Sequence, residues 1–450
     1  MHGATPNTKK HSLPIGCTKD NDPLADKTTM HQLIESYVAI GNFSGVVLVG
    51  KNDHIIFQEA YGMANYELDA PNTIDMKFRI GSLTKVFTAA AIADLQSKDA
   101  LHLDNYLSDY FPDYPHGDTI TILNLLNHSS GILNYTALPD YHVFKKLPAT
   151  LETLHSRFKD KPLEFTPGSK QHYSNSNYRL LADIIEKISG LSYEEYLKQY
   201  IFAPLNMCNS GVDNPKTILK NRTAGYDVDF KASTLINADY IDMSVAKGAG
   251  DLYASIHDLY LFIRSIYKQK LFSVFDNILK AQLDESKEKN STYGWGIDTL
   301  FGKKLLARDG QIDGFHAVMY QFIEDDMSVI VLSNFKFSSV EPIARGLAAI
   351  AFKQPYEIPK KHIPTKIDPT VYDDYIGIYQ DSQPITIIKE NNQLFSQTKR
   401  LKLPLLPRSE TEFFIPFMNS EISFIKDTDS NIIKIIMNQD GVKRILEKKS

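Results

Sequence analysis

Cysteine and tryptophan are almost missing from this chain of 450 residues, which contains two cysteines and one tryptophan. Cys17 and Cys208 lie far apart in the sequence, so we expect two free thiols, which do not indicate a redox compartment. No His-Glu-x-x-His segment occurs, and no pair of cysteines or histidines has the spacing of metal ligands. The sequence therefore predicts neither a metal nor another cofactor.

Long apolar runs and an excess of positive charge are also missing. No apolar run approaches the about eighteen residues that a membrane span needs, so we expect no transmembrane segment. The formal net charge of −5 argues against a nucleic-acid partner. What the chain does have is length and a 43% share of hydrophobic residues, which predict two domains with a sizeable core.

Eight Ser-x-x-Lys tetrads occur, and one of them, Ser82-Leu83-Thr84-Lys85, has a setting that indicates catalysis. Gly81 permits a tight turn into a helix, and Ser82 can sit where the helix begins. The apolar residues that follow, 86–92, should hold Lys85 away from water, which a mere helix cap would not need. The other tetrads, which we expect to be solvated serine and lysine pairs, begin at Ser156, Ser244, Ser265, Ser286, Ser333, Ser396 and Ser423.

Ser82 and Lys85 are spaced for nucleophilic catalysis. Residues three apart lie on one face of a helix, so the Lys85 amine can reach the Ser82 hydroxyl. Lysine has an ordinary pKa near 10.4 and is charged at neutral pH, but burial can lower that pKa by up to about 3–5 units and so make Lys85 a useful base. Tyr173-Ser174-Asn175 adds a second proton carrier and an amide that can bind a carbonyl. We predict Ser82, Lys85 and Tyr173 as catalytic and Asn175 as substrate-binding; the base can be Lys85 or a Tyr173 phenolate.

These motifs, and ordered blocks between them, resemble the penicillin-recognising serine hydrolases. The similarity is to the branch of class C β-lactamases, D-alanyl-D-alanine carboxypeptidases and related esterases, and it covers roughly residues 28–352. The resemblance implies an acyl-enzyme formed at Ser82 and hydrolysed by water. The blocks that carry it are 78–88, 103–112, 120–131, 167–178, 184–190, 248–253 and 293–296.

The third motif departs from the family pattern, because Arg308-Asp309-Gly310 stands where Lys-Thr-Gly or His-(Thr/Ser/Gly)-Gly is usual. The resemblance implies that these residues bind substrate and that the glycine lets the backbone approach it closely. It also implies an oxyanion hole made by the main-chain N–H groups of Ser82 and Gln311. Main-chain donors survive side-chain substitution, so the altered motif leaves this part of the mechanism intact.

Asp309 changes the substrate that we expect. It adds a negative charge where the carboxylate of a penicillin or a D-alanyl peptide would sit, and two such charges at about 4 Å repel by about 4 kcal/mol at an effective dielectric near 20. This favours a neutral ester or amide, or a ligand with a cationic group. The alternative is that Asp309 points away and pairs with Arg308 or Lys303 as a surface ion pair.

Strand-like segments at both ends of the first 352 residues enclose a helical middle. This order predicts an α/β (α+β) fold with one antiparallel sheet flanked by helices and an inserted helical subdomain, which is also the fold that the resemblance implies. The active site would lie between sheet and helices. The expected strands are 45–50, 55–58, 317–323 and 328–332, the expected helices are 30–37 and 342–352, and the helical middle is 82–283.

After residue 352 the pattern changes to spaced prolines and then to strands and turns, which resemble the small C-terminal antiparallel β-barrel of some relatives. The barrel can be a stabilising cap, or a lid that brings Phe413 or Phe414 near the cleft. We expect strands at 385–388, 393–396, 413–415, 422–424 and 432–436. The predicted organisation is a flexible segment 1–27, a β-lactamase-like hydrolase domain 28–352, a Pro-rich linker 353–370 and a barrel domain 371–450.

Three functions stay open. The first is a serine hydrolase of an ester or peptide-like amide, and the second is a true β-lactamase or D-alanyl-D-alanine carboxypeptidase, with a β-lactam-like substrate, which Asp309 disfavours. The third is a non-catalytic binding protein on the same fold, which retention of the catalytic set disfavours.

Residues 1–10 are polar and do not resemble a signal peptide. The resemblance implies a periplasmic or secreted protein if a leader lies outside this sequence, and a cytoplasmic one otherwise.

Three histidines lie beside the family blocks: His128, His172 and His316. We expect them to be structural hydrogen-bonding residues rather than catalytic bases. His172 directly precedes Tyr173 and is therefore the first to test. The sequence does not indicate an oligomeric state.

Overall fold

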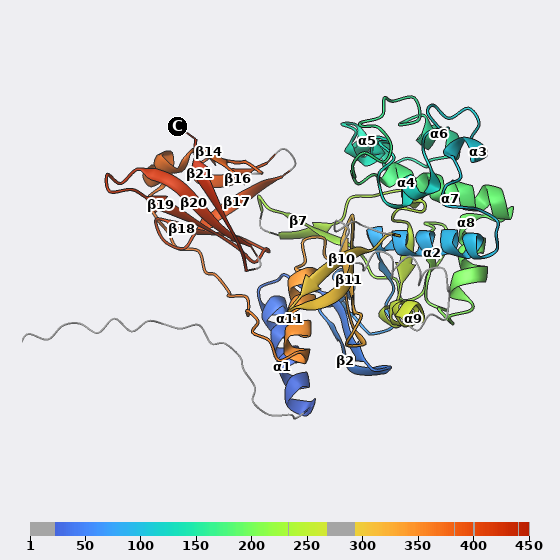
Figure 1. Cartoon of the computed structure of the whole chain (residues 1–450). Coiled ribbons are helices and arrows are strands. Elements are labelled where there is room, and N and C mark those ends of the chain that lie inside the picture. Colours follow the sequence, from blue (N-terminus) through green and yellow to red (C-terminus); the bar gives the residue numbers. More distant parts are fainter. Residues whose placement is uncertain are drawn as a thin grey trace, which may run out of the picture.

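The structure, a computed structural model, describes residues 23–232, 234–267, 293–381, 383–398, 401–439 and 441–449. Its centre is a six-stranded antiparallel sheet in the order β10-β11-β12-β13-β1-β2 (Figure 1). Strands from the two ends of the hydrolase-like region meet in it, as the sequence predicts. The strands are β1 (Gly45–Lys51), β2 (His54–Tyr61), β10 (Gly296–Leu300), β11 (Lys303–Ile312), β12 (Phe315–Phe322) and β13 (Met327–Ser333).

Alternating side chains divide the core between the two faces of this sheet. Val47 and Val49 of β1 pack with α1 (Pro23–Ala39) and α11 (Val340–Ala351), which lie side by side in Figure 1. Val46 and Leu48 point to the opposite face, into the larger core formed with α2 (Thr84–Ser97) and α9 (Ile256–Tyr267). Successive residues of a strand face opposite sides, so the β1 sequence fills both layers.

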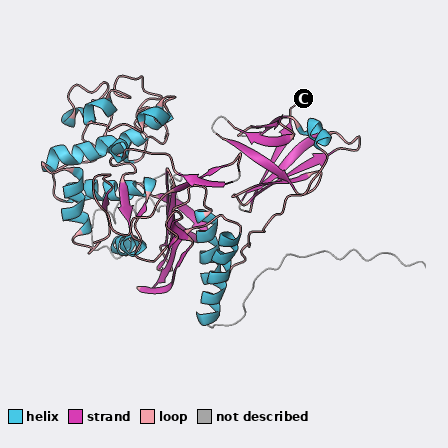
Figure 2. Ribbon diagram, turned by 180° about the vertical axis from the view of Figure 1, so that it is seen from behind, coloured by secondary structure: helices cyan, strands magenta, loops and turns pink. Residues whose placement is uncertain are grey.

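A helical region follows β5 (Phe78–Arg79) and covers the α2 side of the sheet (Figure 2). Its longest member, α7 (Asn175–Ser189), contacts α2 and begins at Asn175, so the Tyr173-Ser174-Asn175 motif lies where the chain enters that helix. The other elements are η1 (Gly81–Leu83), α3 (Leu107–Tyr110), α4 (Ile122–Leu126), η2 (Tyr135–Ala137), α5 (Tyr141–Phe144), α6 (Leu151–His155), α8 (Tyr193–Leu197), η3 (Lys198–Phe202) and η4 (Met243–Ala246).

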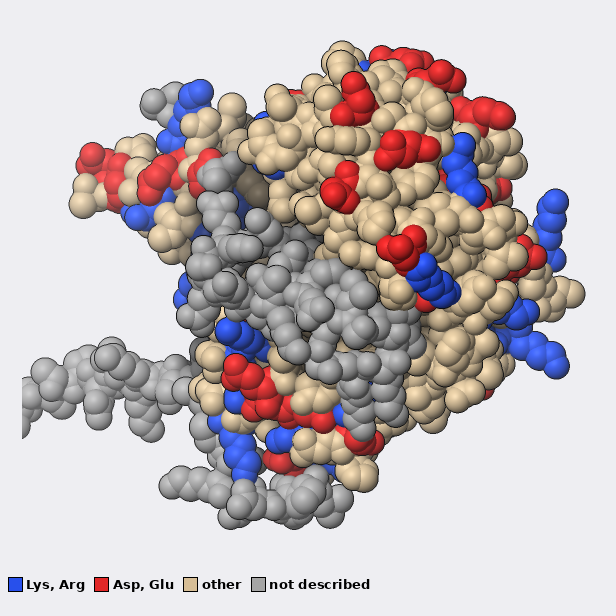
Figure 3. All heavy atoms as spheres, turned by 45° about the vertical axis from the view of Figure 1, so that its right-hand side comes forward, with Lys and Arg blue, Asp and Glu red and all other residues tan. Residues whose placement is uncertain are grey.

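Short strands complete this part of the chain. β6 (Gly211–Val212) and β9 (Leu252–Ala254) join β5 in a three-stranded sheet, and β3 (Met63–Asn65) pairs with β4 (Ala70–Pro71). β7 (Tyr226–Asp229) and β8 (Thr234–Asn237) form a separate hairpin. Charged side chains of both signs are interspersed with uncharged surface on the face shown in Figure 3.

The C-terminal part is a closed eight-stranded antiparallel barrel, which confirms the predicted fold. All five expected strands are present. Three further strands, β14, β17 and β21, were not predicted. The barrel elements are η5 (Pro369–Tyr375), β14 (Gly377–Gln380), β15 (Ile385–Glu390), β16 (Gln393–Gln397), β17 (Lys402–Pro407), β18 (Glu412–Ile415), β19 (Ser420–Lys426), β20 (Ile432–Gln439) and β21 (Val442–Lys448).

Among the described residues, Asn42 and the β7–β8 hairpin both contact the barrel. The fully buried Asn42 side chain donates from Nδ2 to the carbonyl oxygens of Phe417, at 2.6 Å, and Phe337, at 3.1 Å. Phe230, in the turn of the β7–β8 hairpin, packs against the barrel core and against the Phe337 ring, with the ring centroids 5.0 Å apart. The hairpin therefore links the barrel to the sheet region.

Three expectations about particular segments need correction or qualification. Helix α1 begins at Pro23, so residues 23–27, expected in the flexible segment, belong to a helix. Phe413 and Phe414 are buried in the barrel, where Phe413 packs on other barrel aromatics, so neither approaches the cleft. The end of the predicted helical middle, within 268–292, lies outside the described residues, as does Cys17.

Candidate active site

Ser82 lies in the 3-10 turn η1, immediately before α2, on a main chain pressed against β11. Gly81 has φ +51°, and a Cβ at this position would stand 2.9 Å from the main-chain nitrogen of Gln311. A Cβ on Gly310 would meet the carbonyl oxygen of Ile80 and stand 2.7 Å from the nitrogen of Leu83. The two glycines therefore let the nucleophile turn and the third-motif strand touch. The close approach that Gly310 permits is to the chain itself.

Lys85 is completely buried and hydrogen-bonded on all sides of its amine. Its Nζ lies 3.2 Å from the Ser82 Oγ, 2.8 Å from the Asn175 Oδ1 and 2.7 Å from the carbonyl oxygen of Ala249. The helical spacing that the sequence indicated thus brings the amine to the hydroxyl.

The partners of Lys85 fix where its lone pair can point. A carbonyl oxygen and an amide oxygen accept hydrogen bonds and donate none, so Ala249 and Asn175 take two N–H groups of the amine. The remaining position on Nζ faces the Ser82 Oγ. In the neutral amine this position holds the lone pair, which is then directed at the serine hydroxyl.

Tyr173 completes a compact group around the hydroxyl. Its phenolic oxygen lies 2.7 Å from the Ser82 Oγ, and the Lys85 Nζ lies 4.8 Å from the centre of its ring. Arg308 donates from Nη2 to the same phenolic oxygen, at 3.3 Å, and from Nε to the Ser82 carbonyl oxygen, at 3.2 Å. Arg308 thus joins the group from strand β11.

Burial and like charge act on the ionisable groups of this site. Burial lowers the pKa of Lys85 to about 8, Tyr173 opposes the shift, and the Arg308 guanidinium adds to it. Burial tends to raise the pKa of Tyr173, but the positive charges of Lys85 and Arg308 outweigh it and hold that pKa below its usual value. Both candidate bases are therefore easier to deprotonate than the free side chains.

Asn175 makes contacts other than those expected for it. Its Nδ2 donates to the Thr136 Oγ1, at 3.0 Å, and to the Asn134 Oδ1, at 3.4 Å, while its Oδ1 accepts from Lys85. Asn134 also accepts from the main-chain N–H of Asn175, at 3.1 Å. The amide that we expect to orient an acyl group thus also holds Lys85 in place.

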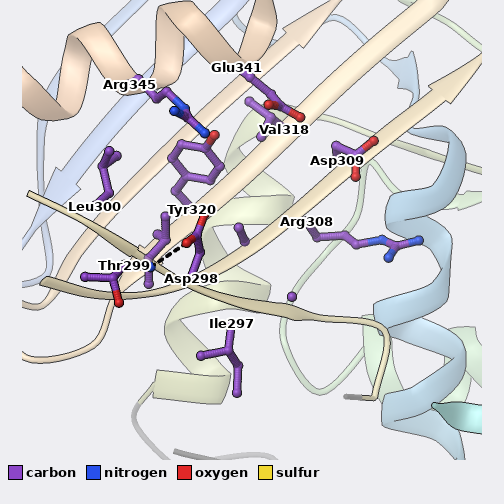
Figure 4. Close-up of a pocket in the computed structure, with 13 residues that line it drawn as sticks. Ile297, Asp298, Thr299, Leu300, Arg308, Asp309, Val318, Tyr320, Glu341 and Arg345 are labelled. Carbon is purple, nitrogen blue, oxygen red and sulfur yellow. Dashed lines mark hydrogen bonds between the residues drawn. The ribbon is translucent and has the colours of Figure 1, made fainter. Parts of the chain in front are cut away.

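Arg308 and Asp309 project to opposite faces of β11 (Figure 4). In the strand register Arg308 lies opposite Met319, which belongs to the core on the α2 side, and Asp309 lies opposite Val318, which belongs to the core on the α11 side. Asp309 does not turn toward Arg308, and Lys303 pairs with Asp325 at 2.6 Å. The expected surface ion pair of Asp309 with Arg308 or Lys303 therefore does not form.

Asp309 lines a groove instead. The groove has a volume of about 530 Å³ and lies between β10, β11, β12 and the first turns of α11. Three of its lining side chains are carboxylates, Asp298, Asp309 and Glu341, and Arg345 faces them from α11 (Figure 4). Arg308 also lines the groove, so its charged lining consists of three carboxylates and two arginines.

Gln311 presents its main chain, not its side chain, to the nucleophile turn. Its Nε2 donates to the carbonyl oxygen of Lys336, at 2.8 Å, so the side chain is engaged elsewhere. The β10–β11 register ends at the pair Gly296 and Ala307, and the following residues of β11 have no neighbouring strand on that side among the described residues.

Sequence reasoning missed the groups that position the predicted site. Ala249 lies in the 248–253 block, which was noticed without a role, and Asn134 and Thr136 follow the 120–131 block with no motif of their own. The nominated histidine, His172, binds Glu164 at 2.6 Å and is exposed, whereas His128 contacts the Tyr173 ring at 4.6 Å between centroids. Among the described residues no group of three or more metal-ligating side chains could hold an ion.

Comparison with known families shows which family the chain belongs to. The family described as Beta-lactamase matches residues 30–352. The chain belongs to the β-lactamase family. As a member it is a serine hydrolase that acts on an ester or amide bond. No helix in the described ranges is long and apolar enough to cross a membrane.

Relatives of this β-lactamase family member include penicillin-binding protein 4* of Bacillus subtilis, 27% identical over 436 residues, which cover 92% of this chain and 96% of the relative. The teichoic acid D-alanine hydrolase of Staphylococcus aureus is 26% identical over 309 residues, which cover 68% of this chain and 74% of the relative.

Two solved structures share the fold. The octameric penicillin-binding protein homologue from Pyrococcus abyssi aligns with a TM-score of 0.65 and 24% identity, over 93% of this chain and 99% of that one. The D-amino acid amidase from Ochrobactrum anthropi SV3 aligns with a TM-score of 0.64 and 23% identity, over 73% of this chain and 99% of that one. The first alignment spans the barrel region as well as the hydrolase region.

Proposed function

We propose that Ser82 is the nucleophile of this hydrolase, that Lys85 is the base that activates it and that Tyr173 carries the proton to the leaving group. The observation that carries the proposal is the buried Lys85 amine, whose remaining position faces the Ser82 Oγ. The Tyr173 phenolate is the alternative base, because its pKa is also lowered.

The reaction follows from these positions. The Ser82 proton moves to the neutral Lys85 amine as the Ser82 Oγ forms a bond to the substrate carbonyl carbon. When the tetrahedral intermediate collapses, the bond to the leaving group breaks, and Tyr173 donates a proton to that group while receiving one from Lys85. Water then attacks the acyl-enzyme, which releases the acid and restores the Ser82 hydroxyl.

The tetrahedral intermediate requires donors for its negative oxygen. We assign them to the main-chain N–H groups of Ser82 and Gln311, and the close approach of Gly81 to the Gln311 main chain supports this assignment. Arg308, bound to the Ser82 carbonyl and the Tyr173 oxygen, adds positive charge beside them. Arg308 thereby stabilises negative charge on the oxygen of the intermediate and on the Tyr173 phenolic oxygen.

The preferred substrate that we propose is a neutral ester or amide, or one with an ammonium group. Asp309 faces away from Ser82, so it and the other carboxylates of the groove do not touch a substrate at the nucleophile and disfavour a substrate carboxylate only from the far side of β11. The name of the Staphylococcus aureus relative, a teichoic acid D-alanine hydrolase, supports an aminoacyl ester as one such substrate. A true β-lactamase or D-alanyl-D-alanine carboxypeptidase is the alternative.

Mass spectrometry after incubation with a fluorophosphonate, and separately with benzylpenicillin, tests the nucleophile. We expect a fluorophosphonate adduct on the wild type and none on Ser82→Ala, together with loss of turnover. The variant Ser244→Ala, from another Ser-x-x-Lys tetrad, is the control and should still be labelled. Labelling of Ser82→Ala would place the nucleophile elsewhere, and an adduct with penicillin as well would favour the alternative function.

Turnover rates test the substrate class. We expect kcat/KM to be higher for p-nitrophenyl acetate and for the methyl ester of D-alanine than for a chromogenic cephalosporin, and Asp309→Asn should reduce this difference. A strong preference of the wild type for the cephalosporin would overturn the assignment.

We also propose the organisation of the chain. Residues 28–352, together with the start of α1 at 23–27, form the hydrolase unit, and residues 353–370 connect it to the barrel unit, 371–450. Residues 354–368 have neither helix nor strand and the barrel has a core of its own, which supports this division. A chain ending at about residue 360, compared with the full chain on small and large esters, tests whether the barrel selects substrates or only stabilises the fold.

A further inference from the structure

His128 has an unusual backbone and a buried ring close to the proposed proton carrier. It has φ +61°, in the left-handed region that residues other than glycine rarely adopt, and it is 3% exposed. Such a conformation costs free energy and persists where the surrounding contacts fix it.

Hydrogen bonds that His128 accepts hold the chain on both sides of Tyr173. Its carbonyl oxygen accepts from the main-chain N–H of His172, at 2.9 Å, and its Nδ1 accepts from the main-chain N–H of Ser174, at 3.2 Å. Its ring also lies against the Tyr173 ring, with the centroids 4.6 Å apart. One residue thus fixes the backbone before and after Tyr173 and contacts the side chain between them.

We propose that His128 is a positioning residue that holds the Tyr173 phenol within reach of Ser82 and Lys85. The inference rests on the role assigned to Tyr173 under the proposed function. The Tyr173 oxygen is 2.7 Å from the Ser82 Oγ, and a small displacement of the phenol would lengthen this contact and the one to Arg308. Proton transfer between such groups requires hydrogen-bond distances.

The protonation state of His128 is set by its surroundings. Because Nδ1 accepts from Ser174, the proton of the neutral ring is on Nε2, which has no hydrogen-bond partner among the described residues. Burial, then the charges of Lys85 and Arg308, lower the pKa of His128 well below its usual range. The other groups near the ring are His172, Tyr173 and Tyr178, and the Asn177 Nδ2 lies 3.5 Å from Nδ1.

A neutral ring is the form that this role needs. A proton on Nδ1 would face the N–H of Ser174 and break the contact, and it would add a third positive charge beside Lys85 and Arg308. The low pKa keeps His128 an acceptor throughout the neutral range, so His128 does not itself act as a base.

A pair of substitutions separates the effect of losing the Nδ1 acceptor from the effect of the left-handed backbone conformation. Glycine and asparagine both tolerate φ near +60°, but only asparagine places an oxygen where Nδ1 stands. With p-nitrophenyl acetate at pH 8, we expect His128→Gly to lower kcat by about tenfold to hundredfold, the range for misplaced catalytic groups, and His128→Asn to recover part of that loss. The exposed His172→Gln is the matched control and should stay within about twofold of the wild type.

A double-mutant cycle distinguishes positioning from a general loss of structure. In the Tyr173→Phe background, removal of His128 should cost much less than in the wild type, because its target hydroxyl is already gone. Equal costs in both backgrounds, or full activity of folded His128→Gly, would overturn the inference. A wild type with neither ester turnover nor fluorophosphonate labelling would instead overturn the proposed function, on which the inference depends.

Discussion

At Lys85 the environment favours the neutral amine, and this has a measurable pH dependence. The base must lose its proton, and burial lowers its pKa to about 8, so kcat/KM for a neutral ester should rise with pH to a plateau with an apparent midpoint near 8. Because Lys85 and Tyr173 interact, this midpoint belongs to the pair. Arg308→Gln should move it to higher pH, and Arg308→Lys, which keeps the charge, should move it less. An unchanged midpoint in Arg308→Gln would contradict the electrostatic role of Arg308.

The sequence predicted Ser82 and Lys85 from their local spacing, and Tyr173 and Arg308 from motifs that resemble those of a family. Ser82 and Lys85 are one helical turn apart, so their contact follows from the helix alone. Asn134 and Thr136, which hold Asn175, come from the start of η2, some forty residues earlier, and no periodicity connects them to Asn175. The sequence did not show which face of β11 the Asp309 side chain occupies. It gave the position of the third motif, but not which side chains of that strand point to which face.

At the scale of elements, the turn that follows η4 supplies Ala249 to Lys85 and depends on a buried carboxyl group. Asp251 is buried and accepts from the main-chain N–H of Gly248, at 3.0 Å. Burial raises its pKa from 3.8 to about 7. Between these values the folded protein keeps a proton that the unfolded chain has lost, so this contribution to stability is complete below the lower value and is lost as pH rises to about 7.

The variant Asp251→Asn should remove this loss. Relative to Asp251→Asn, the free energy of unfolding of the wild type should fall by roughly 3 kcal/mol between pH 5 and pH 8, since one pKa unit is worth about 1.4 kcal/mol. Urea denaturation at the two pH values measures the difference. If the wild type gained stability over Asp251→Asn with rising pH, the assigned shift would have the wrong sign.

The packing of η1 against β11 predicts a sharp steric effect. Gly310→Ala places a methyl group against the Ile80 carbonyl and 2.7 Å from the Leu83 nitrogen, so the nucleophile turn must move. We expect a loss of about 3 kcal/mol or more in stability, or a near-complete loss of activity. Gly296→Ala is the control, because its nearest contact would be 3.4 Å. Equal behaviour of the two variants would argue against this packing.

Strand prediction succeeded or failed for reasons of composition. The expected barrel strands are rich in isoleucine and phenylalanine, which favour strands. β17 contains Pro404 and Pro407, which argue against a strand in any sequence-based assignment, and β21 carries charged residues at most positions. These two strands form because the barrel closes through them, and closure depends on the whole fold.

At the scale of the molecule, Asn42 connects the barrel to the hydrolase region. Its Nδ2 donates hydrogen bonds to two carbonyl oxygens, and its Oδ1 accepts one from the main-chain N–H of Ser339, at 3.0 Å. Asn42→Leu would leave these buried groups unpaired, at about 1–3 kcal/mol each. For Asn42→Leu we expect calorimetry to show a separate unfolding transition of the barrel, at a lower temperature than the unfolding of the wild type. The control variant Asn214→Leu, at an exposed position, should unfold as the wild type does. A single unshifted transition in Asn42→Leu would refute this coupling.

In the part of the chain that the structure describes, the barrel is closed, whereas β11 has no neighbouring strand on one side beyond Ala307. An extended peptide-like chain that paired with this edge would be bound through its main chain whatever its side chains, so selectivity would have to come from the adjoining groove. In the described barrel strands the backbone is already paired on both sides. A molecule that bound to the barrel would therefore have to be recognised by side chains and not by main-chain pairing. The ligand preferences of the two surfaces can consequently change independently in evolution.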